Sequence, residues 1–220
     1  MQPVVSPRLN PSGFPRSMKK TAILLLLLCS LAALRRASAQ PLINEIMYHP
    51  ASTNVLEDFI EIYNSSSTNL DLTGWALSKG VHFGFPSNTI LRAGAYLVVV
   101  ADTTTFSSKY PGVTNFLGNW TGKLSRNGEQ LELDDPTGQA VNSVEFAPEG
   151  DWAVRRLGAA DSFGKRGWEW FAEHDGYGKT LELINPALPN GFGQNWASSL
   201  VVNGTPGRAN SIAQTNIPHD

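Results

Sequence analysis

The sequence is almost without cysteine: among 220 residues there is one, Cys29, and it lies in an apolar stretch near the N-terminus. The rest of the chain therefore contains no disulfide framework. A domain without disulfides is held together by burial alone, which suits a domain of about 150 residues or more and not a miniature scaffold.

Basic residues are scarce as well. Beyond residue 40 the chain has 11 Lys and Arg against 19 Asp and Glu, so its formal charge there is 11 − 19 = −8. No basic stripe interleaved with aromatic residues is present. This composition predicts that the protein does not bind nucleic acid directly, because such binding depends on neutralising phosphates.

The longest hydrophobic run, residues 21–34, is shorter than the 18 or so residues that span a bilayer. Two lysines precede it, and an Ala-x-Ala pattern ends at Ala39. We predict a signal peptide cleaved between Ala39 and Gln40. The mature protein would be secreted, or held at the cell surface or in the periplasm, with no membrane span.

Two alternatives stay open at this end of the chain. Arg35 and Arg36 stand close to the proposed cleavage site, which keeps an uncleaved anchor in consideration. Met18 opens a more typical signal than Met1 and is a second candidate for the true start.

Beyond the signal, the chain consists of short segments rich in β-branched, aromatic and alternating residues, separated by Gly, Pro, Asn and Asp. No helical pattern of 10 to 15 residues lies between them. The sequence therefore predicts an all-β fold, a sandwich or a barrel. The segments are "PLINEIMY", "DFIEIYN", "WALS", "VHFGF", "YLVVVA", "EQLELDD" and "AVNSVEF".

The alternation of apolar residues loses phase at Thr73 and Gly74. A glycine can adopt the backbone angles of a bulge or corner, which would turn Trp75 into the space between two sheets. The residues predicted to form the core are Ile60, Ile62, Trp75, Phe83 and Phe85.

Local sequence also predicts turns and one helix. "DDPTGQ", residues 134–139, is typical of a hairpin, and "RNGE", residues 126–129, is typical of a turn before an inward-facing strand. In "DTTTFSSKY", Asp102 can cap a short helix.

Residues 147–210 are looser and rich in glycine and aromatics. We expect an extension that returns to cover the sandwich, with Trp168, Trp170, Phe171 and Trp196 as apolar anchors. The alternative is a platform on which sugars stack, formed by Trp168, Trp170, Phe171 and Tyr177. The last residues, 211–220, are predicted to be a mobile tail.

Five strings in this order resemble the lamin-tail domain, an immunoglobulin-like β-sandwich, in the form found in exported bacterial proteins. They are "INEIMYHP" (43–50), "DFIEIYN" (58–64), "LDLTGWALS" (70–78), "FGFPSNTILRAGAYLVVV" (83–100) and "NGEQLELDDPTGQAVNSVEF" (127–146). The resemblance places the sandwich at residues 41–146.

The resemblance implies a non-enzymatic interaction or structural module that binds a protein or a surface polymer such as a polysaccharide. Bacterial domains of this kind often stand beside nuclease, phosphatase or spore-coat-kinase-like domains, so an accessory role in a larger secreted protein is an alternative. The oligomeric state stays open.

Four acidic residues are candidates for a calcium site: Glu45, Glu57, Asp58 and Glu61. A calcium-assisted carbohydrate-binding module is therefore a further alternative; otherwise no cofactor is expected. Alternation also offers a simpler interpretation for Glu61: if Ile60 and Ile62 face inward, Glu61 faces outward, where it meets water or a basic side chain.

The four histidines are scattered and none has metal-ligand spacing, so we expect surface positions for His49, His82, His174 and His219. The serines in loops lack the frame of a nucleophile elbow, and "HDGYGKT" lacks the spacing of a phosphate-binding loop. We predict no enzymatic activity.

Overall fold

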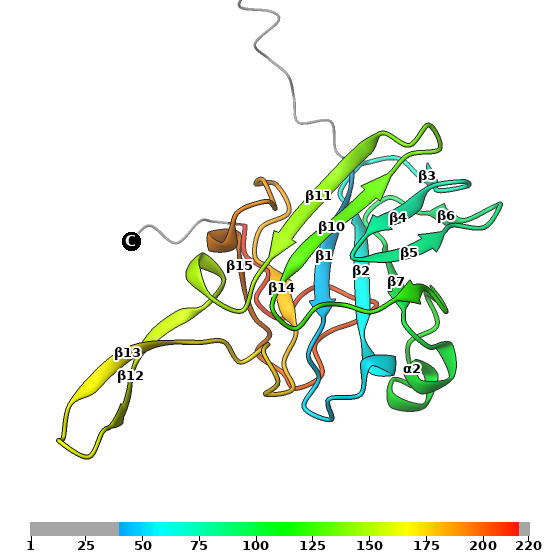
Figure 1. The fold of residues 1–220 in the computed structure, drawn as a ribbon. Coiled ribbons are helices and arrows are strands. Elements are labelled where there is room, and N and C mark those ends of the chain that lie inside the picture. The colour runs from blue at the N-terminus through cyan, green and yellow to red at the C-terminus, as the bar shows by residue number, and fades with distance from the viewer. Residues whose placement is uncertain (1–39, 216–220) are drawn as a thin grey trace, which may run out of the picture. The chain divides into compact units, whose positions relative to one another are not determined.

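The computed structural model describes residues 40–215, and in this part of the chain two β-sheets pack face to face (Figure 1). The predicted signal peptide, residues 1–39, and His219 lie outside the described residues. The prediction of an all-β sandwich is confirmed. No helix within residues 40–215 has the length and apolar character needed to cross a membrane.

The first sheet has six strands, and only β7 and β8 run parallel to each other. Its central strands, β1 and β2, are the segments "PLINEIM" and "FIEIYN". In spatial order the strands are β15 (Trp196–Ser198), β14 (Leu181–Leu183), β1 (Pro41–Met47), β2 (Phe59–Asn64), β7 (Tyr96–Val100) and β8 (Phe116–Gly118).

The second sheet has five strands, all antiparallel to their neighbours. The β10–β11 hairpin closes at Asp135, whose side chain accepts hydrogen bonds from Thr137 N and Gln139 N at 2.8 and 3.1 Å, so the turn predicted there is confirmed. The strands are, in order, β11 (Ala140–Phe146), β10 (Glu129–Asp134), β4 (Ala76–Lys79), β5 (Val81–Gly84) and β9 (Thr121–Gly122).

The main core lies between the sheets, and Ile60, Ile62 and Phe85 are buried in it as predicted. Phe83 and Trp75 are only partly buried. The Trp75 ring therefore packs against the main core, but it is not fully buried between the sheets as predicted. The indole rings buried in this core are instead those of Trp120 and Trp196.

The corner at Gly74 is confirmed. The preceding strand, β3 (Leu70–Asp71), pairs with β6 (Ile90–Leu91) in a small separate sheet, whereas the following strand, β4, belongs to the second sheet. Gly74 has φ +74°, a conformation that favours glycine. Because Trp75 stands directly at this change of sheet, its ring reaches the core from the edge and keeps a solvent-facing side.

The outer face of the first sheet is also covered. Helix α2 (Thr103–Lys109) begins at Asp102, whose side chain accepts a hydrogen bond from Thr105 N at 2.7 Å, as predicted for a cap. Phe106 of this helix packs with Phe59 and neighbouring side chains in a second apolar cluster. Strands β1 and β2 are thus buried on both faces.

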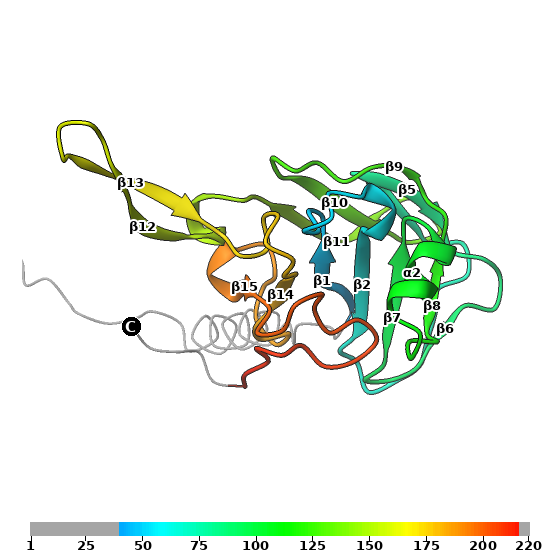
Figure 2. The same cartoon turned by 90° about the horizontal axis from the view of Figure 1, so that it is seen from below.

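Residues beyond 147 add two strands to the first sheet and also form a hairpin outside it. β14 pairs with β1 and β15 pairs with β14. The hairpin of β12 (Val154–Ala160) and β13 (Arg166–Phe171) pairs only with itself and extends away from both sheets (Figures 1 and 2). Three 3-10 turns complete the described elements: η1 (Val55–Glu57), η2 (Gly150–Trp152) and η3 (Gly193–Asn195).

Candidate functional site

Three glutamates lie side by side on the outer face of the first sheet. Glu45 of β1 stands opposite Glu61 of β2 on one side and opposite Glu182 of β14 on the other. All three side chains are fully buried. We call these three residues the glutamate ladder.

The ladder is covered by residues 203–212, which we call the closing segment. Its backbone donates directly to the carboxylates: Thr205 N lies 2.8 Å from Glu45 Oε1, and Gly207 N lies 2.6 Å from Glu61 Oε2. In Figure 2 this part of the chain, coloured orange to red, crosses the first sheet on the side away from β10 and β11. Peptide N–H groups therefore replace the water that would otherwise solvate the acids.

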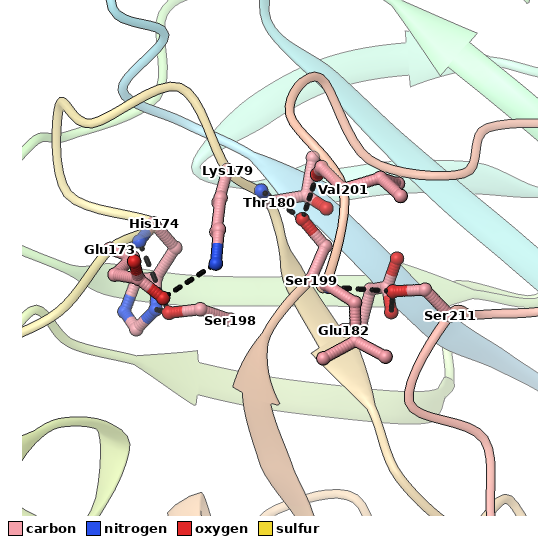
Figure 3. A network of polar contacts seen from close by, with 10 residues as sticks. Glu173, His174, Lys179, Thr180, Glu182, Ser198, Ser199, Val201 and Ser211 are labelled. Atoms are coloured by element: carbon pink, nitrogen blue, oxygen red, sulfur yellow. Dashed lines mark hydrogen bonds and ion pairs between the residues drawn. The ribbon is translucent and has the colours of Figure 1, made fainter.

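Glu182 is held by the same segment. Its Oε1 accepts from Thr205 Oγ at 2.7 Å, and its Oε2 accepts from Ser211 Oγ at 2.7 Å and from Ile212 N at 3.2 Å. Figure 3 shows Ser211 directed at Glu182. Ser211 and Ile212, which the sequence assigned to a tail, are thus bonded to the body of the domain.

The closing segment approaches the ladder so closely that residue 204 has no room for a side chain. A Cβ on Gly204 would lie 2.0 Å from Glu45 Oε1 and 2.5 Å from Thr180 Oγ, and the residue has φ +72°. Thr180 Oγ itself donates to Glu45 Oε1 at 2.6 Å. Glycine is therefore required here for both space and conformation.

Asn210 fastens the other end of the closing segment. Its Nδ2 donates to the carbonyl oxygens of Asn44 and Leu183 at 2.9 and 2.8 Å, and its Oδ1 accepts from Asn44 Nδ2 at 2.8 Å. Asn44 Nδ2 also donates to Glu61 Oε1 at 2.8 Å. One buried amide pair thus connects the closing segment, two strands and the ladder.

Burial favours the neutral form of two ladder residues, Glu45 and Glu61. Removal from water raises the pKa of Glu45 to about 8, against the hydrogen bond from Thr180, and the nearby Glu182 carboxylate adds to the rise. Burial and the neighbouring Glu45 also raise the pKa of Glu61 well above its usual range. At neutral pH Glu45 therefore retains its proton, and the ladder acts as a structural acceptor of hydrogen bonds.

The four residues proposed for calcium do not form one site. Glu45 and Glu61 are in the ladder, and Glu57 is paired with Lys109 of helix α2. Asp58 directly precedes β2, and neither of its carboxylate oxygens is hydrogen-bonded to the ladder. Within residues 40–215, no group of three or more His, Cys, Asp and Glu is placed to hold a metal ion. The expectation that Glu61 faces solvent was wrong, because the closing segment covers the face to which it points.

Asp58 is buried at the start of β2, and neither carboxylate oxygen has a hydrogen-bond partner among the described residues. Burial raises the pKa of Asp58 to about 8, and the positive charge of Arg126 opposes part of this rise. A protonated Asp58 avoids the cost of burying an unpaired charge. Asp58 is therefore consistent with a neutral side chain that packs inside the domain.

The histidines are distributed differently from the prediction. His82 is exposed, as its alternation indicates, but His174 is fully buried between Tyr48 and Ser198, with Nδ1 2.9 Å from Ser198 Oγ (Figure 3). Burial lowers the pKa of His174 to about 4, so the ring is neutral at physiological pH. His49 is half-buried, and its Nδ1 lies 2.6 Å from Asp175 Oδ1.

The hairpin presents a second unusual surface. Trp168 and Trp170 on β13 are 64% and 45% exposed, so the prediction that they anchor the extension was wrong. Trp196 does fulfil that prediction, at 4% exposure, and Phe171 is half-buried at the base of the hairpin. Hydrophobic composition alone did not distinguish the anchor from the exposed rings.

Sequence reasoning also missed Glu182 and the closing segment. A signal was available for two of the three ladder residues: Glu61 and Glu182 are each flanked by apolar residues, in "FIEIY" and "TLELI". A near-continuous apolar run is typical of a strand buried on both faces, and in these two strands the run is interrupted only by the glutamate. Local patterns could not reveal that "NGTPGRAN" contacts these glutamates, because Glu45 and Glu61 are 160 and 146 positions away from their partners.

The profile of the family described as Lamin Tail Domain matches residues 35–147. This chain belongs to the lamin tail domain family. The family is a non-catalytic, immunoglobulin-like domain, which agrees with the two-layered sandwich described above. A search of curated proteins found no match. In this lamin tail domain, the closing segment and the hairpin both lie beyond the matched residues.

Proposed function

We propose that the protein is a non-enzymatic, exported interaction module of the lamin-tail type, which binds a protein or a surface polymer through the β12–β13 hairpin. The observation that supports this most directly is the exposure of large apolar side chains on that hairpin. Phe163 at its tip is 86% exposed, and both tryptophans of β13 face solvent. Clusters of exposed apolar residues mark interaction sites more often than scattered ones do.

The tip is an ordered structure. Asp161 Oδ1 accepts hydrogen bonds from Phe163 N and Lys165 N, both at 2.9 Å, and Asp161 N donates to Lys165 O at 2.8 Å. The turn therefore holds Phe163 outward in one conformation. A preorganised contact residue lowers the entropy lost on binding.

Export is proposed from the N-terminal sequence, and the absence of catalysis from the family. The carboxyl groups of the glutamate ladder are used inside the fold, because they accept hydrogen bonds from the closing segment. Binding is thus the activity left to the exposed parts of the domain. The hairpin is the exposed part with the clearest chemical character.

The test is a binding screen of the purified protein against cell-surface protein fractions and immobilised polymers, each with and without calcium. The polymers should include neutral and acidic polysaccharides, single-stranded DNA and anionic vesicles. We expect saturable binding that weakens when Trp168 and Trp170 are both replaced by alanine. Failure of the wild-type protein to bind any partner saturably would overturn the proposed function.

A further inference from the structure

The two faces of the β12–β13 hairpin differ in how their charges are balanced. On one face, Arg156 Nε lies 2.8 Å from Glu169 Oε1, and its guanidinium stacks 3.8 Å from the centre of the Phe171 ring. The cation on that face is therefore neutralised and packed within the hairpin. This face needs no partner.

The opposite face contains Arg155, Leu157, Trp168 and Trp170, and we call it the Trp face. The strand register pairs Arg155 with Trp170 and Leu157 with Trp168, so their side chains stand on the same side. The Arg155 guanidinium lies 5.4 and 5.8 Å from the ring centres of Trp170 and Trp168. Both rings thus flank one cation, which orients them.

Arg155 makes no ion pair within residues 40–215. Its guanidinium lies over the two tryptophan rings and keeps its positive charge, and both rings are exposed. A ligand that stacks on the rings and brings an anion to the guanidinium would complete the Trp face. The chemistry required is a flat apolar surface next to a carboxylate.

The charge of the hairpin differs from that of the rest of the domain. Residues 154–171 contain four Lys and Arg against two Asp and Glu, a formal charge of +2. The remainder of residues 40–215 contains seven against sixteen, a formal charge of −9. An acidic ligand is therefore attracted to the hairpin and repelled by the body, which favours binding at the Trp face alone.

We propose that the Trp face binds an acidic polysaccharide in which a carboxylate-bearing sugar alternates with a neutral one. The apolar C–H face of a pyranose ring stacks on an indole, and side chains two residues apart on a strand are roughly 6.6 Å apart, which suits successive rings. One guanidinium between two indoles matches one carboxylate for each pair of sugars. This inference rests on the proposed function and specifies its ligand class.

Nucleic acid is the less suitable polymer, although its bases also stack on aromatic rings. It carries a phosphate on every nucleotide, and a body with a formal charge of −9 repels that density of charge. A polysaccharide with a carboxylate on alternate sugars meets less repulsion. Within the described part of the chain, Arg155 is the one cation that the Trp168 and Trp170 rings contact. The next cation along this side of β13 is Arg166, whose Nε donates to Gly158 O at 2.7 Å, and the two do not form a continuous basic track.

The experiment uses the purified protein and two probes: hyaluronan oligosaccharides, in which glucuronate alternates with an N-acetyl sugar, and the same oligosaccharides with their carboxyl groups reduced to alcohols. We expect the acidic probe to bind at least about tenfold more tightly than the reduced one. Replacing both Trp168 and Trp170 by alanine should weaken binding of both probes by about tenfold or more. Arg155→Gln should weaken binding of the acidic probe only.

Matched controls are available outside the hairpin. Phe192 is an exposed aromatic residue and Arg92 is an exposed cation. Phe192→Ala and Arg92→Gln should leave binding of the acidic probe unchanged. Because the substituted side chains are exposed, all variants should keep the wild-type melting temperature. This measurement distinguishes a loss of binding from a loss of folding.

Equal affinity for both probes would overturn the proposed ligand class while leaving the proposed function standing. Tighter binding of single-stranded DNA or anionic vesicles through the Trp face would do the same. Binding that survives the double tryptophan replacement would overturn the Trp face as the site, here and in the proposed function. If the wild-type protein binds none of these probes and no surface protein, the proposed function fails as well.

Discussion

The glutamate ladder and the Trp face both come from stretches that look similar in sequence, with charged residues between apolar ones. In "FIEIY" the charged residue is covered by the closing segment and loses its solvent. In "RGWEWF" the strand has no covering layer, and its tryptophans stay in water. Whether the side chains of such a strand are buried or exposed therefore depends on whether a distant segment of the chain covers them.

The largest expected difference between the two regions concerns their tryptophans. Trp196→Ala should lower the free energy of unfolding by about 3 to 5 kcal/mol, because it empties a buried site where Nε1 also donates to Asn190 O at 2.8 Å. Trp168→Ala should change it by less than about 0.5 kcal/mol. Urea denaturation of both variants measures this, and equal losses would mean that the hairpin is part of the cooperative core.

The second prediction tests how closely the closing segment approaches the ladder. Gly204→Ala should cost about 3 kcal/mol or more, because the added Cβ collides with Glu45 and the backbone is left-handed. Gly94→Ala is the matched control, with φ +69° and no atom within 4 Å of the added Cβ, and should cost about 1 kcal/mol. Similar losses in the two variants would contradict the contact.

The third prediction concerns pH. The pKa of Glu45 is 4.5 in its usual state and about 8 in the folded protein, so above pH 4.5 the unfolded chain releases a proton that the folded chain keeps. Stability from this group is fully present below pH 4.5 and is lost as pH rises through 8, by at most about 1.4 kcal/mol for each pH unit.

The variant Glu45→Gln should therefore reduce the decline in the free energy of unfolding between pH 5 and pH 9. Glu169→Gln on the exposed hairpin is the control and should leave that decline unchanged. Denaturation curves across this range provide the measurement. An identical pH dependence for wild type and Glu45→Gln would show that Glu45 does not store a proton in the fold.

The smallest effect is expected from the surface ion pair of the hairpin. Arg156 and Glu169 are each about half exposed, and such pairs contribute about 0 to 1 kcal/mol. Arg156→Gln should thus leave the melting temperature almost unchanged at 0.15 M salt. A clear loss of stability would instead mean that the hairpin unfolds together with the core of the sandwich.

Local chemistry explains which structural features were predictable from the sequence. The corner at Gly74, the helix cap at Asp102 and the turn at Asp135 depend on residues next to one another, and all three were found. Glu61 shows where this stops: alternation correctly placed it on the face opposite Ile60 and Ile62, but did not reveal the cover. That cover comes from Gly207, 146 positions further along the chain.

The tryptophans show the same limit for apolar residues. Trp168, Trp170 and Trp196 have the same affinity for burial, and only the pairing of β14 with β1 carries Trp196 into the core. The candidate calcium ligands were likewise separated by their partners: the closing segment covers Glu45 and Glu61, and Lys109 of helix α2 pairs with Glu57.

The pairing of β1 with β14 also has a consequence for how the molecule is made. β1 is the first strand of the sandwich, yet its neighbour β14 and the cover over Glu45 are synthesised some 135 to 160 residues later. Until then one edge of β1 has no partner, and folding must wait for contacts between the beginning and the end of the domain. Such long-range closure slows folding and leaves this strand edge exposed until the end of the domain has been made.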